Sequence, residues 1–572
     1  MEQDQPTIAT NFQNWALQNP EQVAIAIHAQ TYTYGELYQA AQAIAQTLTS
    51  STSGQSAMPW VAICLPNGIE FLECFLGTVL AGGVAMVLDP KWPTQYIQQI
   101  LDWGCDRHFL DPALSLPKTY SRTSLIDSHS RIFNVHKHDS ESGDRPFYVG
   151  FTSGTTGLPK GVIRSHRSWV ESFAASQIEF DTCAADQILV PGSLVHSLSL
   201  YAVLEGLNAG ATVHILPKFS PKAIFDRLNT TAITKLVAVP TVLQTLVKAA
   251  TKTYDVRTVI AGGSKLEPEL RHQLPQVFPK ADILEYFGAL ELSFVSLSSS
   301  REAVPPESVG RAFRGVELSI QRQDGRGEAA IAEVGLVCVK SPFLSSGYLE
   351  SPNASSNAVP SESSNVSSNA VPSESSNVSP NKSSSEFSSV FPHASSSESS
   401  GKFSNVPSDA SLSESPSESS NEFSNVSSGD GIEPGLSWSK VMDVGWATVG
   451  DLGWMDAKGY LYLVGREADR ILTGGMNAYP VEVEAALRQL PEVLEVAVFG
   501  VPDGERGEAI AAAICWGDRP LSRLEIHQRL QSRLSAAKMP RHFFTLKDLQ
   551  DFPRTNSGKI KRDALRKQWT SR

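Results

Sequence analysis

The sequence lacks the cysteine pattern, the long apolar run and the leader that would place it in several common classes. Six cysteines are scattered over 572 residues, without a C-x-x-C pair, so neither a disulfide scaffold nor a zinc site is indicated. The most apolar run, residues 74–88, contains two adjacent glycines and is shorter than the roughly 20 residues of a membrane span. The first residues are polar and acidic, unlike a secretory signal. These absences predict a cytoplasmic protein without a transmembrane segment.

An excess of basic residues is also missing. The formal net charge is −12, and phosphate neutralisation by a nucleic-acid binder needs clustered Lys and Arg, so we expect no nucleic-acid partner. Residues 351–430 hold nine acidic and two basic side chains, which leaves a net charge of only −5 for the rest. With 41% apolar residues the chain has the composition of a soluble globular protein. Its length exceeds what one hydrophobic core supports, which predicts at least two domains.

One segment, residues 351–431, differs from everything around it. It consists mainly of Ser, Asn, Pro and Glu, and the twelve residues 356–367 recur unchanged at 368–379. So few large apolar side chains cannot offset the entropy of ordering the chain. We therefore predict a disordered, low-complexity Ser-rich insertion at 351–431.

On both sides of this insertion, strand-like and helix-like stretches alternate. Residues 32–49 have the pattern of an amphipathic helix, with Thr33 and Glu36 placed as a capping box. Strands are predicted at 60–64, 84–88, 211–216, 235–239, 495–500 and 509–515. Helices are predicted at 71–81, 221–228, 241–250 and 521–534. This alternation predicts an α/β fold: a large N-terminal domain of stacked, mainly parallel sheets with helices, and a small α+β C-terminal domain.

The segment FTSGTTGLPKGV, residues 151–162, carries the chemistry. Glycines allow the backbone to approach a phosphate chain closely, and the hydroxyl groups around them can donate hydrogen bonds to it. The order of residues is not that of a Walker loop, G-x-x-x-x-G-K-[ST]. A plain Ser/Thr/Gly-rich surface turn is the alternative, but such turns rarely continue into Pro-Lys-Gly. The segment therefore predicts a phosphate-binding loop.

With this loop, the sequence resembles the adenylate-forming superfamily of acyl-CoA synthetases, nonribosomal-peptide adenylation domains and firefly luciferase, and is most like an acyl-CoA synthetase. Further signatures follow in order: VPTVLQTL (239–246), AGGSKLEPEL (261–270), EYFGALE (285–291), TVGDLGW (448–454), GREADRILTGGMNAYPVEVE (465–484) and PRTNSGKIKR (553–562). The resemblance covers nearly the whole chain outside the insertion. It implies an N-terminal AMP-binding domain at 1–465, interrupted by the insertion, and a C-terminal domain at 466–572.

The resemblance also implies the residues that bind ATP and Mg2+. The phosphates would contact Thr152, Ser153, Gly154, Thr155, Thr156, Gly157 and Lys160. Phe287 and Gly288 would lie against adenine, with the backbone of Gly262 and Gly263 at its edge. Glu291 would bind Mg2+, a cation that prefers carboxylate and phosphate oxygens, together with Thr156. Asp451 would accept hydrogen bonds from the ribose hydroxyls, with Arg466 nearby.

Lys559 is implied as the main catalytic residue, because an ammonium can bridge the substrate carboxylate and the α-phosphate during in-line attack. Most lysines near a C-terminus are simply solvated, but the Thr-Asn-Ser-Gly lead-in favours the catalytic role. The C-terminal domain would rotate about a hinge near 465–469, and Gly474 and Gly475 would line the path of CoA.

Three positions depart from the family pattern. Leu290 stands where Thr or Ser usually precedes the Mg2+ carboxylate, which removes a hydroxyl group but not the backbone N–H. Val449 replaces a common Thr, and Ala468 replaces a polar hinge residue. The charged residues Glu291 and Lys559 are intact.

His196 bears on which acid is activated. Amino-acid-activating relatives have an Asp near this position, and without it a bound ammonium would lack its counter-charge. Amino acids are therefore disfavoured. In acyl-CoA synthetases a His here gates the acyl pocket, while a structural histidine has comparable weight. A fatty acid or an aromatic acid such as o-succinylbenzoate remains open.

The predicted reaction is ATP-dependent formation of acyl-AMP and pyrophosphate, followed by transfer to CoA. An alternative acceptor is a carrier-protein thiol acting in trans. A different class of function, a non-catalytic scaffold that binds partners through the Ser-rich insertion, is the third hypothesis. Pyrophosphate release with and without CoA separates the three.

Overall fold

The computed structural model describes most of the chain on both sides of the Ser-rich segment. The described residues are 6–50, 58–102, 105, 107–112, 114, 144–152, 159–323, 326–349, 445–473, 476–504, 507–555 and 559–570. The predicted insertion at 351–431 lies outside them, as do Ser153, Gly154, Thr155, Thr156, Gly157, Gly474 and Gly475. The predictions made for these positions therefore remain predictions.

The largest sheet in the described chain has the strand order β14-β13-β12-β11-β10-β8-β9-β1-β2. Its strands are β1 (Val23–Ile27), β2 (Gln30–Thr33), β8 (Gln187–Val190), β9 (Thr212–Ile215), β10 (Lys235–Ala238), β11 (Thr258–Ala261), β12 (Asp282–Ala289), β13 (Ser293–Ser299) and β14 (Arg311–Ala312). The central strands from β12 to β1 pair in parallel, while β2, β13 and β14 are antiparallel additions at the two edges.

A second sheet has the strand order β17-β7-β6-β4-β3-β5. Its strands are β3 (Trp60–Cys64), β4 (Val84–Val87), β5 (Arg107–Leu110), β6 (Pro146–Thr152), β7 (Lys160–Ser165) and β17 (Gly347–Leu349). The strands from β6 to β5 are parallel, and β7 turns back antiparallel on β6. The segment predicted to bind phosphates connects β6 to β7, so it lies at the carboxyl end of a parallel strand, where ligands of α/β folds bind.

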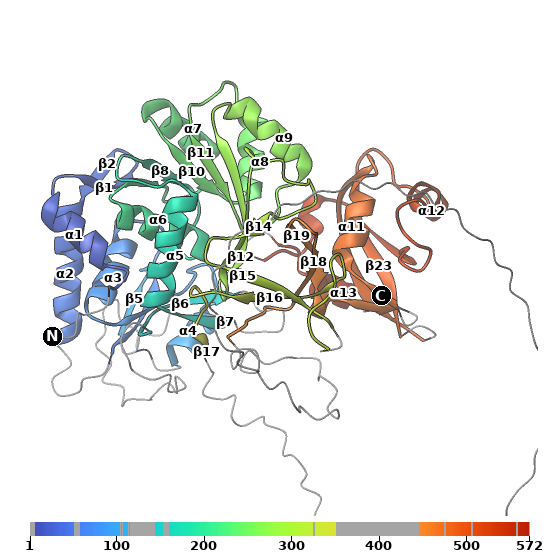
Figure 1. Cartoon of the computed structure of the whole chain (residues 1–572), viewed down its shortest axis with the longest axis horizontal. Helices are drawn as coiled ribbons and strands as arrows, with labels where there is room; N and C mark the ends of the chain where they lie inside the picture. The colour runs from blue at the N-terminus through green and yellow to red at the C-terminus, as the bar shows by residue number, and fades with distance from the viewer. Residues whose placement is uncertain are drawn as a thin grey trace, which may run out of the picture. The chain divides into compact units, whose positions relative to one another are not determined.

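Helices cover and join these two sheets (Figure 1). They are α1 (Thr10–Gln18), α2 (Tyr34–Ser50), α3 (Ile69–Leu80), α4 (Thr94–Asp102), α5 (His166–Glu179), α6 (Ser197–Ala209), α7 (Pro221–Thr230), α8 (Pro240–Ala249) and α9 (Pro268–Val277). Helix α6 packs on β8, β9 and β10 of the first sheet, and α5 packs on β7 of the second. Because α5 and α6 also contact each other, this pair joins the two sheets.

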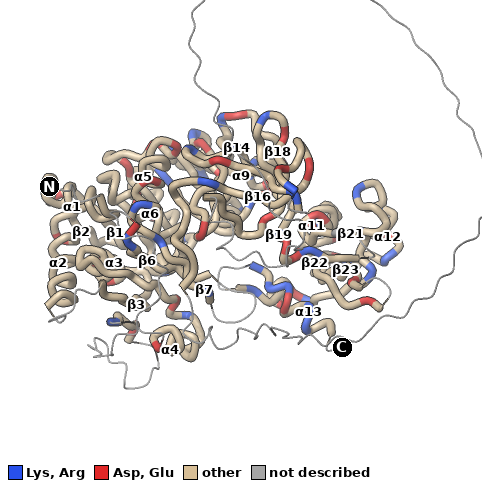
Figure 2. Tube along the Cα trace, turned by 60° about the horizontal axis from the view of Figure 1, so that its bottom comes forward, with Lys and Arg blue, Asp and Glu red and all other residues tan. Residues whose placement is uncertain are grey.

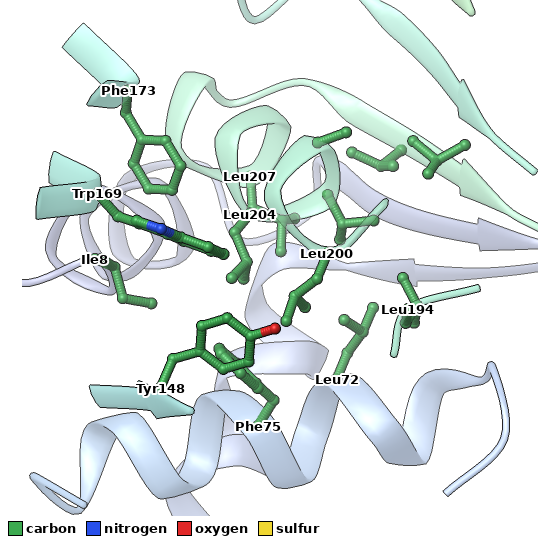
Figure 3. Packing of buried hydrophobic residues seen from close by; sticks show 14 of the residues in the cluster. Ile8, Leu72, Phe75, Tyr148, Trp169, Phe173, Leu194, Leu200, Leu204 and Leu207 are labelled. Atoms are coloured by element: carbon green, nitrogen blue, oxygen red, sulfur yellow. The ribbon is translucent and has the colours of Figure 1, made fainter. Parts of the chain in front are cut away.

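The main hydrophobic core fills the space around this helix pair. Figure 3 shows the Tyr148 ring, from β6, between Trp169 of α5, Leu200 of α6 and Phe75 of α3. The ring centroids of Tyr148 and Trp169 are 5.4 Å apart. Aromatic pairs at such distances add to the stability that burial itself provides. A second core lies under α7, α8 and α9 and includes Leu189, Leu243 and Leu274.

A third sheet is antiparallel throughout and joins the segments before and after the insertion. Its strand order is β15-β16-β18-β19, formed by β15 (Glu317–Gln321), β16 (Gly335–Lys340), β18 (Asp451–Met455) and β19 (Leu461–Arg466). The C-terminal part has its own sheet of β20 (Ile471–Thr473), β21 (Met476–Ala478), β22 (Val493–Asp503), β23 (Gly507–Trp516) and β24 (His542–Leu546). Three helices pack against this sheet: α11 (Pro480–Arg488), α12 (Arg523–Leu530) and α13 (Arg562–Thr570).

The predicted fold class is confirmed: an α/β N-terminal part of stacked sheets and a smaller α+β C-terminal part. The capping box is confirmed as well, since the Thr33 N–H donates to Glu36 at 2.8 Å and the Glu36 N–H donates to Thr33 at 3.2 Å. The helix predicted at 521–534 is wrong at its C-terminal end, because α12 ends at Leu530. There the Arg533 N–H bonds to the Leu530 carbonyl, three residues back, which tightens the chain into turns.

Acidic and basic residues are interspersed along the described chain (Figure 2). Among the helices that the structure describes, none combines the length and the apolarity required to cross a bilayer.

Candidate active site

Glu291 lies at the tip of the β12–β13 hairpin. Ala289 pairs with Ser293, so only residues 290–292 form the turn. Leu292 is buried in the main core, and Ser293 has a positive φ of 62°, a conformation that few residues other than glycine adopt. The Glu291 carbonyl accepts a hydrogen bond from the Ser345 N–H at 2.8 Å. The backbone that carries this carboxylate is therefore held on several sides.

Phe287 and Gly288 precede the hairpin tip at an irregularity in strand pairing. The register shifts between these two residues, and a Cβ atom on Gly288 would lie only 2.2 Å from the Ser293 carbonyl oxygen. Glycine is therefore required here by close approach of the backbone. Phe287 is half-buried and packs on the main core.

The predicted adenine-edge residues, Gly262 and Gly263, follow β11 directly. A Cβ atom on Gly262 would lie 2.5 Å from the ring of Tyr286. Gly263 has a φ of +88°, which favours glycine without any contact argument. Since β11 and β12 are neighbouring parallel strands, both glycines lie at the same sheet edge as Phe287.

Thr152 and Lys160 frame the predicted phosphate loop. They pair across β6 and β7, and the Thr152 hydroxyl lies 3.5 Å from the Lys160 carbonyl oxygen. The Lys160 ammonium lies 5.6 Å from the centroid of the Tyr348 ring, a cation–π distance. The ends of the loop are thereby fixed beside Tyr348.

Tyr348 links the loop to Glu291 and was missed by sequence reasoning. Its hydroxyl donates a hydrogen bond to Oε1 of Glu291 at 2.9 Å. Burial and the adjacent Glu291 carboxylate raise the pKa of Tyr348, so it stays a neutral donor. A tyrosine three residues before the insertion gives no pattern that would identify this contact; only the pairing of β17 with β7 places it here.

Asp451 and Arg466 face each other across β18 and β19. The Arg466 Nε donates to Oδ1 of Asp451 at 3.1 Å. Burial raises the pKa of Asp451, while Arg466 and, more weakly, Lys559 act to lower it. The negative charge of Glu291 adds to the raising of this pKa, so the charges of three other predicted site residues act on Asp451.

Lys559 lies three residues before α13. Its N–H donates to the Thr555 hydroxyl at 3.1 Å, and its carbonyl accepts from the Thr555 N–H at 2.7 Å. The side chain reaches solvent, but surrounding protein and the positive charge of Arg466 lower its pKa, while Asp451 opposes this shift. The charges of Arg466 and Asp451 therefore both act on Lys559.

His196 is the N-cap residue of α6, at the carboxyl side of β8. Burial lowers the pKa of the imidazole, Asp89 opposes the shift and Lys91 adds to it, which favours the neutral ring at pH 7. Asn67 anchors the segment before His196: its amide donates to the Gly192 carbonyl at 2.9 Å and accepts from the Leu194 N–H at 2.8 Å. No motif in the sequence identifies Asn67 or Asp89.

The positions that depart from the family pattern have structural explanations in part. The Leu290 side chain lies close to Gly150 of β6, where an added Cβ atom would meet it at 2.7 Å. Val449 packs against the main core. Ala468 lies in the 3-10 turn Glu467–Asp469, where nothing in the structure explains the choice of alanine.

Known proteins resemble the chain over almost its whole length. A family model described as AMP-binding enzyme matches residues 12–349, and one described as AMP-binding enzyme C-terminal domain matches residues 482–559. YhfT of Bacillus subtilis (strain 168), an uncharacterized acyl–CoA ligase, is 28% identical, with 98% of each chain covered. VraA of Staphylococcus epidermidis, a putative long chain fatty acid–CoA ligase, and the 2-succinylbenzoate–CoA ligase of B. subtilis are each 25% identical, with 97% of each chain covered.

Solved structures show the same fold. The o-succinylbenzoate CoA synthetase of B. subtilis, solved with its acyl-adenylate intermediate, superposes with a TM-score of 0.71 at 23% identity, covering 98% of both chains. ATP-bound MatB from Rhodopseudomonas palustris gives a TM-score of 0.72 at 22% identity, again covering 98% of both chains.

Proposed function

Because the chain belongs to the AMP-binding enzyme family, we propose that it is an AMP-forming acid–thiol ligase that uses ATP, Mg2+ and CoA. In the first half-reaction, a carboxylate oxygen attacks the α-phosphorus of ATP, the bond to the β-phosphate oxygen breaks, and pyrophosphate leaves. In the second, the CoA thiolate attacks the acyl carbon of acyl-AMP, and AMP leaves. Activation is needed because a carboxylate delocalises its charge and is a poor electrophile.

The observation that carries this proposal is the match of both family models, and the contacts of the charged residues that the sequence resemblance implies support it. Asp451 and Arg466 are in direct contact, and Lys559 and Glu291 both influence the pKa of Asp451. In the proposed site, the Asp451 carboxylate accepts hydrogen bonds from the ribose hydroxyl groups. Lys559 stabilises the charge that builds between the carboxylate and the α-phosphate.

Glu291 fits a role in binding Mg2+. Oε1 of its carboxylate accepts a hydrogen bond from the Tyr348 hydroxyl. No group of three or more His, Cys, Asp or Glu side chains gathers as a metal cage in the described part of the chain. Mg2+ commonly binds through one or two carboxylates with phosphate oxygens and water, so a single glutamate beside a phosphate loop suits it. Thr156 would add a hydroxyl ligand.

The domain boundaries proposed for the chain are 1–465 and 466–572, with the Ser-rich insertion 351–431 within the first. Gly474 and Gly475 would line the CoA path between β20 and β21, where the absence of side chains leaves room. We place the enzyme in the cytoplasm, because its six cysteines are free thiols, which is typical of a reducing compartment. A carrier-protein thiol in place of CoA stays a prediction.

The substrate is proposed to be a fatty or aromatic acid. The neutral His196 ring at the start of α6 offers no counter-charge for an amino acid's ammonium group. The named acids of two relatives, a long chain fatty acid and 2-succinylbenzoate, support the same choice.

Pyrophosphate release by the full chain tests this function. We would supply ATP, Mg2+ and one acid at a time (a long chain fatty acid, o-succinylbenzoate or an amino acid), with and without CoA. We expect pyrophosphate and an acyl-CoA product with a fatty or aromatic acid. Turnover only with a carrier-protein thiol would favour the alternative acceptor, and no pyrophosphate with any acid would support a scaffold.

A further inference from the structure

Arg164 is a charged residue one position before the end of β7, where the neighbouring residues Ile163 and Ser165 are also buried. Its side chain has no exposed surface. Burying a guanidinium is unfavourable unless hydrogen bonds compensate for the lost water. A strand in this place needs no charge for packing, so the contacts of Arg164 should explain its presence.

Those contacts converge on the hairpin tip that bears Glu291. Nη1 of Arg164 donates to the Leu290 carbonyl at 3.0 Å and lies 3.4 Å from the Glu291 carbonyl oxygen. Nη2 donates to the Phe343 carbonyl at 2.5 Å and lies 3.5 Å from the Ser293 hydroxyl. One planar guanidinium thus joins β7, both sides of the hairpin turn and the segment that leads into β17.

Each of these segments carries a part of the proposed metal and phosphate site. Strand β7 begins with Lys160, the hairpin presents Glu291, and β17 carries Tyr348, whose hydroxyl contacts the Glu291 carboxylate. Ser345, between Phe343 and Tyr348, donates its N–H to the Glu291 carbonyl. Arg164 is therefore linked to Glu291 in two ways: through the hairpin turn itself and through the segment from Phe343 to Tyr348, whose tyrosine contacts the carboxylate.

We propose that Arg164 is a positioning residue, which fixes Glu291 for Mg2+ binding by tying the carbonyls of the hairpin turn to the Phe343–Tyr348 segment. The inference rests on the proposed metal role of Glu291. Lysine would not serve as well, because its single nitrogen cannot present two parallel pairs of donors as the guanidinium fork does. The hydrogen bond from Arg164 to residue 290 is to the backbone carbonyl, so it does not depend on the side chain at that position.

The test is the affinity of the full chain for Mn2+ in the presence of a nonhydrolysable ATP analogue, measured by electron paramagnetic resonance. Arg164→Lys should weaken Mn2+ binding about tenfold, the usual scale for residues that orient a metal ligand. Tyr348→Phe removes only the hydroxyl group and should weaken it about threefold. Glu291→Gln should weaken binding, and adding Arg164→Lys to it should cause little further loss.

A matched control separates positioning from general damage to the fold. Lys235, in β10 of the other sheet, is also fully buried and donates to the carbonyls of Phe180 and Asp181. Lys235→Arg also replaces one buried cation by another, in the opposite direction to Arg164→Lys. This control should lower the melting temperature, while the affinity for Mn2+ should stay at the wild-type value. If Arg164→Lys behaves in the same way, or its effect is independent of Glu291, the inference is overturned.

Two further outcomes are distinguishable. If Arg164→Lys does not fold, Tyr348→Phe decides, and wild-type Mn2+ affinity in that variant contradicts the network. If Glu291→Gln leaves Mn2+ affinity unchanged, the metal role of Glu291 is wrong, and the positioning role of Arg164 is overturned with it, whatever the acid panel shows about adenylation.

Discussion

Glu291 and Lys559 carry opposite charges in the proposed reaction, and the structure holds them in different ways. Glu291 is on a hairpin whose turn is tied by Arg164 and Ser345 and whose next residue, Leu292, is in the main core. Lys559 is exposed, and its backbone N–H donates to the Thr555 hydroxyl. The carboxylate of Glu291 is half-buried on a hairpin anchored to the N-terminal core, and the ammonium of Lys559 belongs to an exposed residue of the C-terminal part.

This difference suits the demands on each group. A metal ligand must stay within a few tenths of an ångström of its cation, which requires a rigid frame. A cation needed in only one half-reaction can belong to a part that moves relative to that frame, as the family resemblance implies for the C-terminal domain. Substitutions at the two sites should therefore differ in their effects on stability as well as on chemistry.

The largest effect is expected for Lys559→Ala. Loss of a charge that stabilises the transition state should lower acyl-AMP formation roughly 100-fold. Thioester formation from supplied acyl-AMP should be much less affected, and the melting temperature should stay near that of the wild type. Lys567→Ala, an exposed lysine in α13, is the matched control. Equal loss in both half-reactions would contradict the role of Lys559.

Asp451 should give a smaller and chemically distinct defect. Asp451→Ala removes a charged acceptor and should raise the KM for ATP about tenfold, with little change in Mg2+ dependence. Because burial raises the pKa of Asp451, its carboxylate protonates at a higher pH than an ordinary aspartate. The KM for ATP should therefore rise on acidification, and Asp451→Asn should flatten that rise. If Asp451→Ala also changed the Mg2+ concentration that the enzyme requires, the assignment of the ribose to Asp451 and of the metal to Glu291 would be contradicted.

The smallest effect is expected from the Ser-rich segment. Replacing residues 351–431 by a short Gly/Ser linker should leave melting temperature and initial rate nearly unchanged. Loop-closure entropy changes by only about 0.6 kcal/mol for each doubling of loop length. Limited proteolysis should also cut the twelve-residue repeats first. A collapse of rate or stability in the shortened chain would show that the segment contributes to the site or the core.

Sequence reasoning reached the elements whose local pattern is sufficient. The strand at 60–64 and the capping box of α2 were predicted because each depends on neighbouring residues only. The antiparallel sheet β15-β16-β18-β19 was not anticipated among mainly parallel ones. It joins strands from both sides of the insertion, and no local periodicity encodes that pairing.

The same distinction applies to the site. Glycines 262, 263 and 288 and the charged positions were named from motifs, although their roles stay predictions. Arg164 and Tyr348 were not, because their importance comes from contacts between segments more than fifty residues apart in sequence. A charged residue within the buried strand VIRS was the one available signal for Arg164.

The chain is held by strand pairing on both sides of the Ser-rich segment, which bears on how the length of that segment can change. Before it, β17 is paired with β7 at Gly347, Tyr348 and Leu349, and after it, Ala447 is bonded to Val339 in both directions. The twelve residues 356–367 recur unchanged at 368–379, so gain or loss of one whole copy changes the length by twelve residues and keeps the reading frame. Because the paired strands lie outside the repeats, we expect such a change to leave the Tyr348–Glu291 hydrogen bond in place.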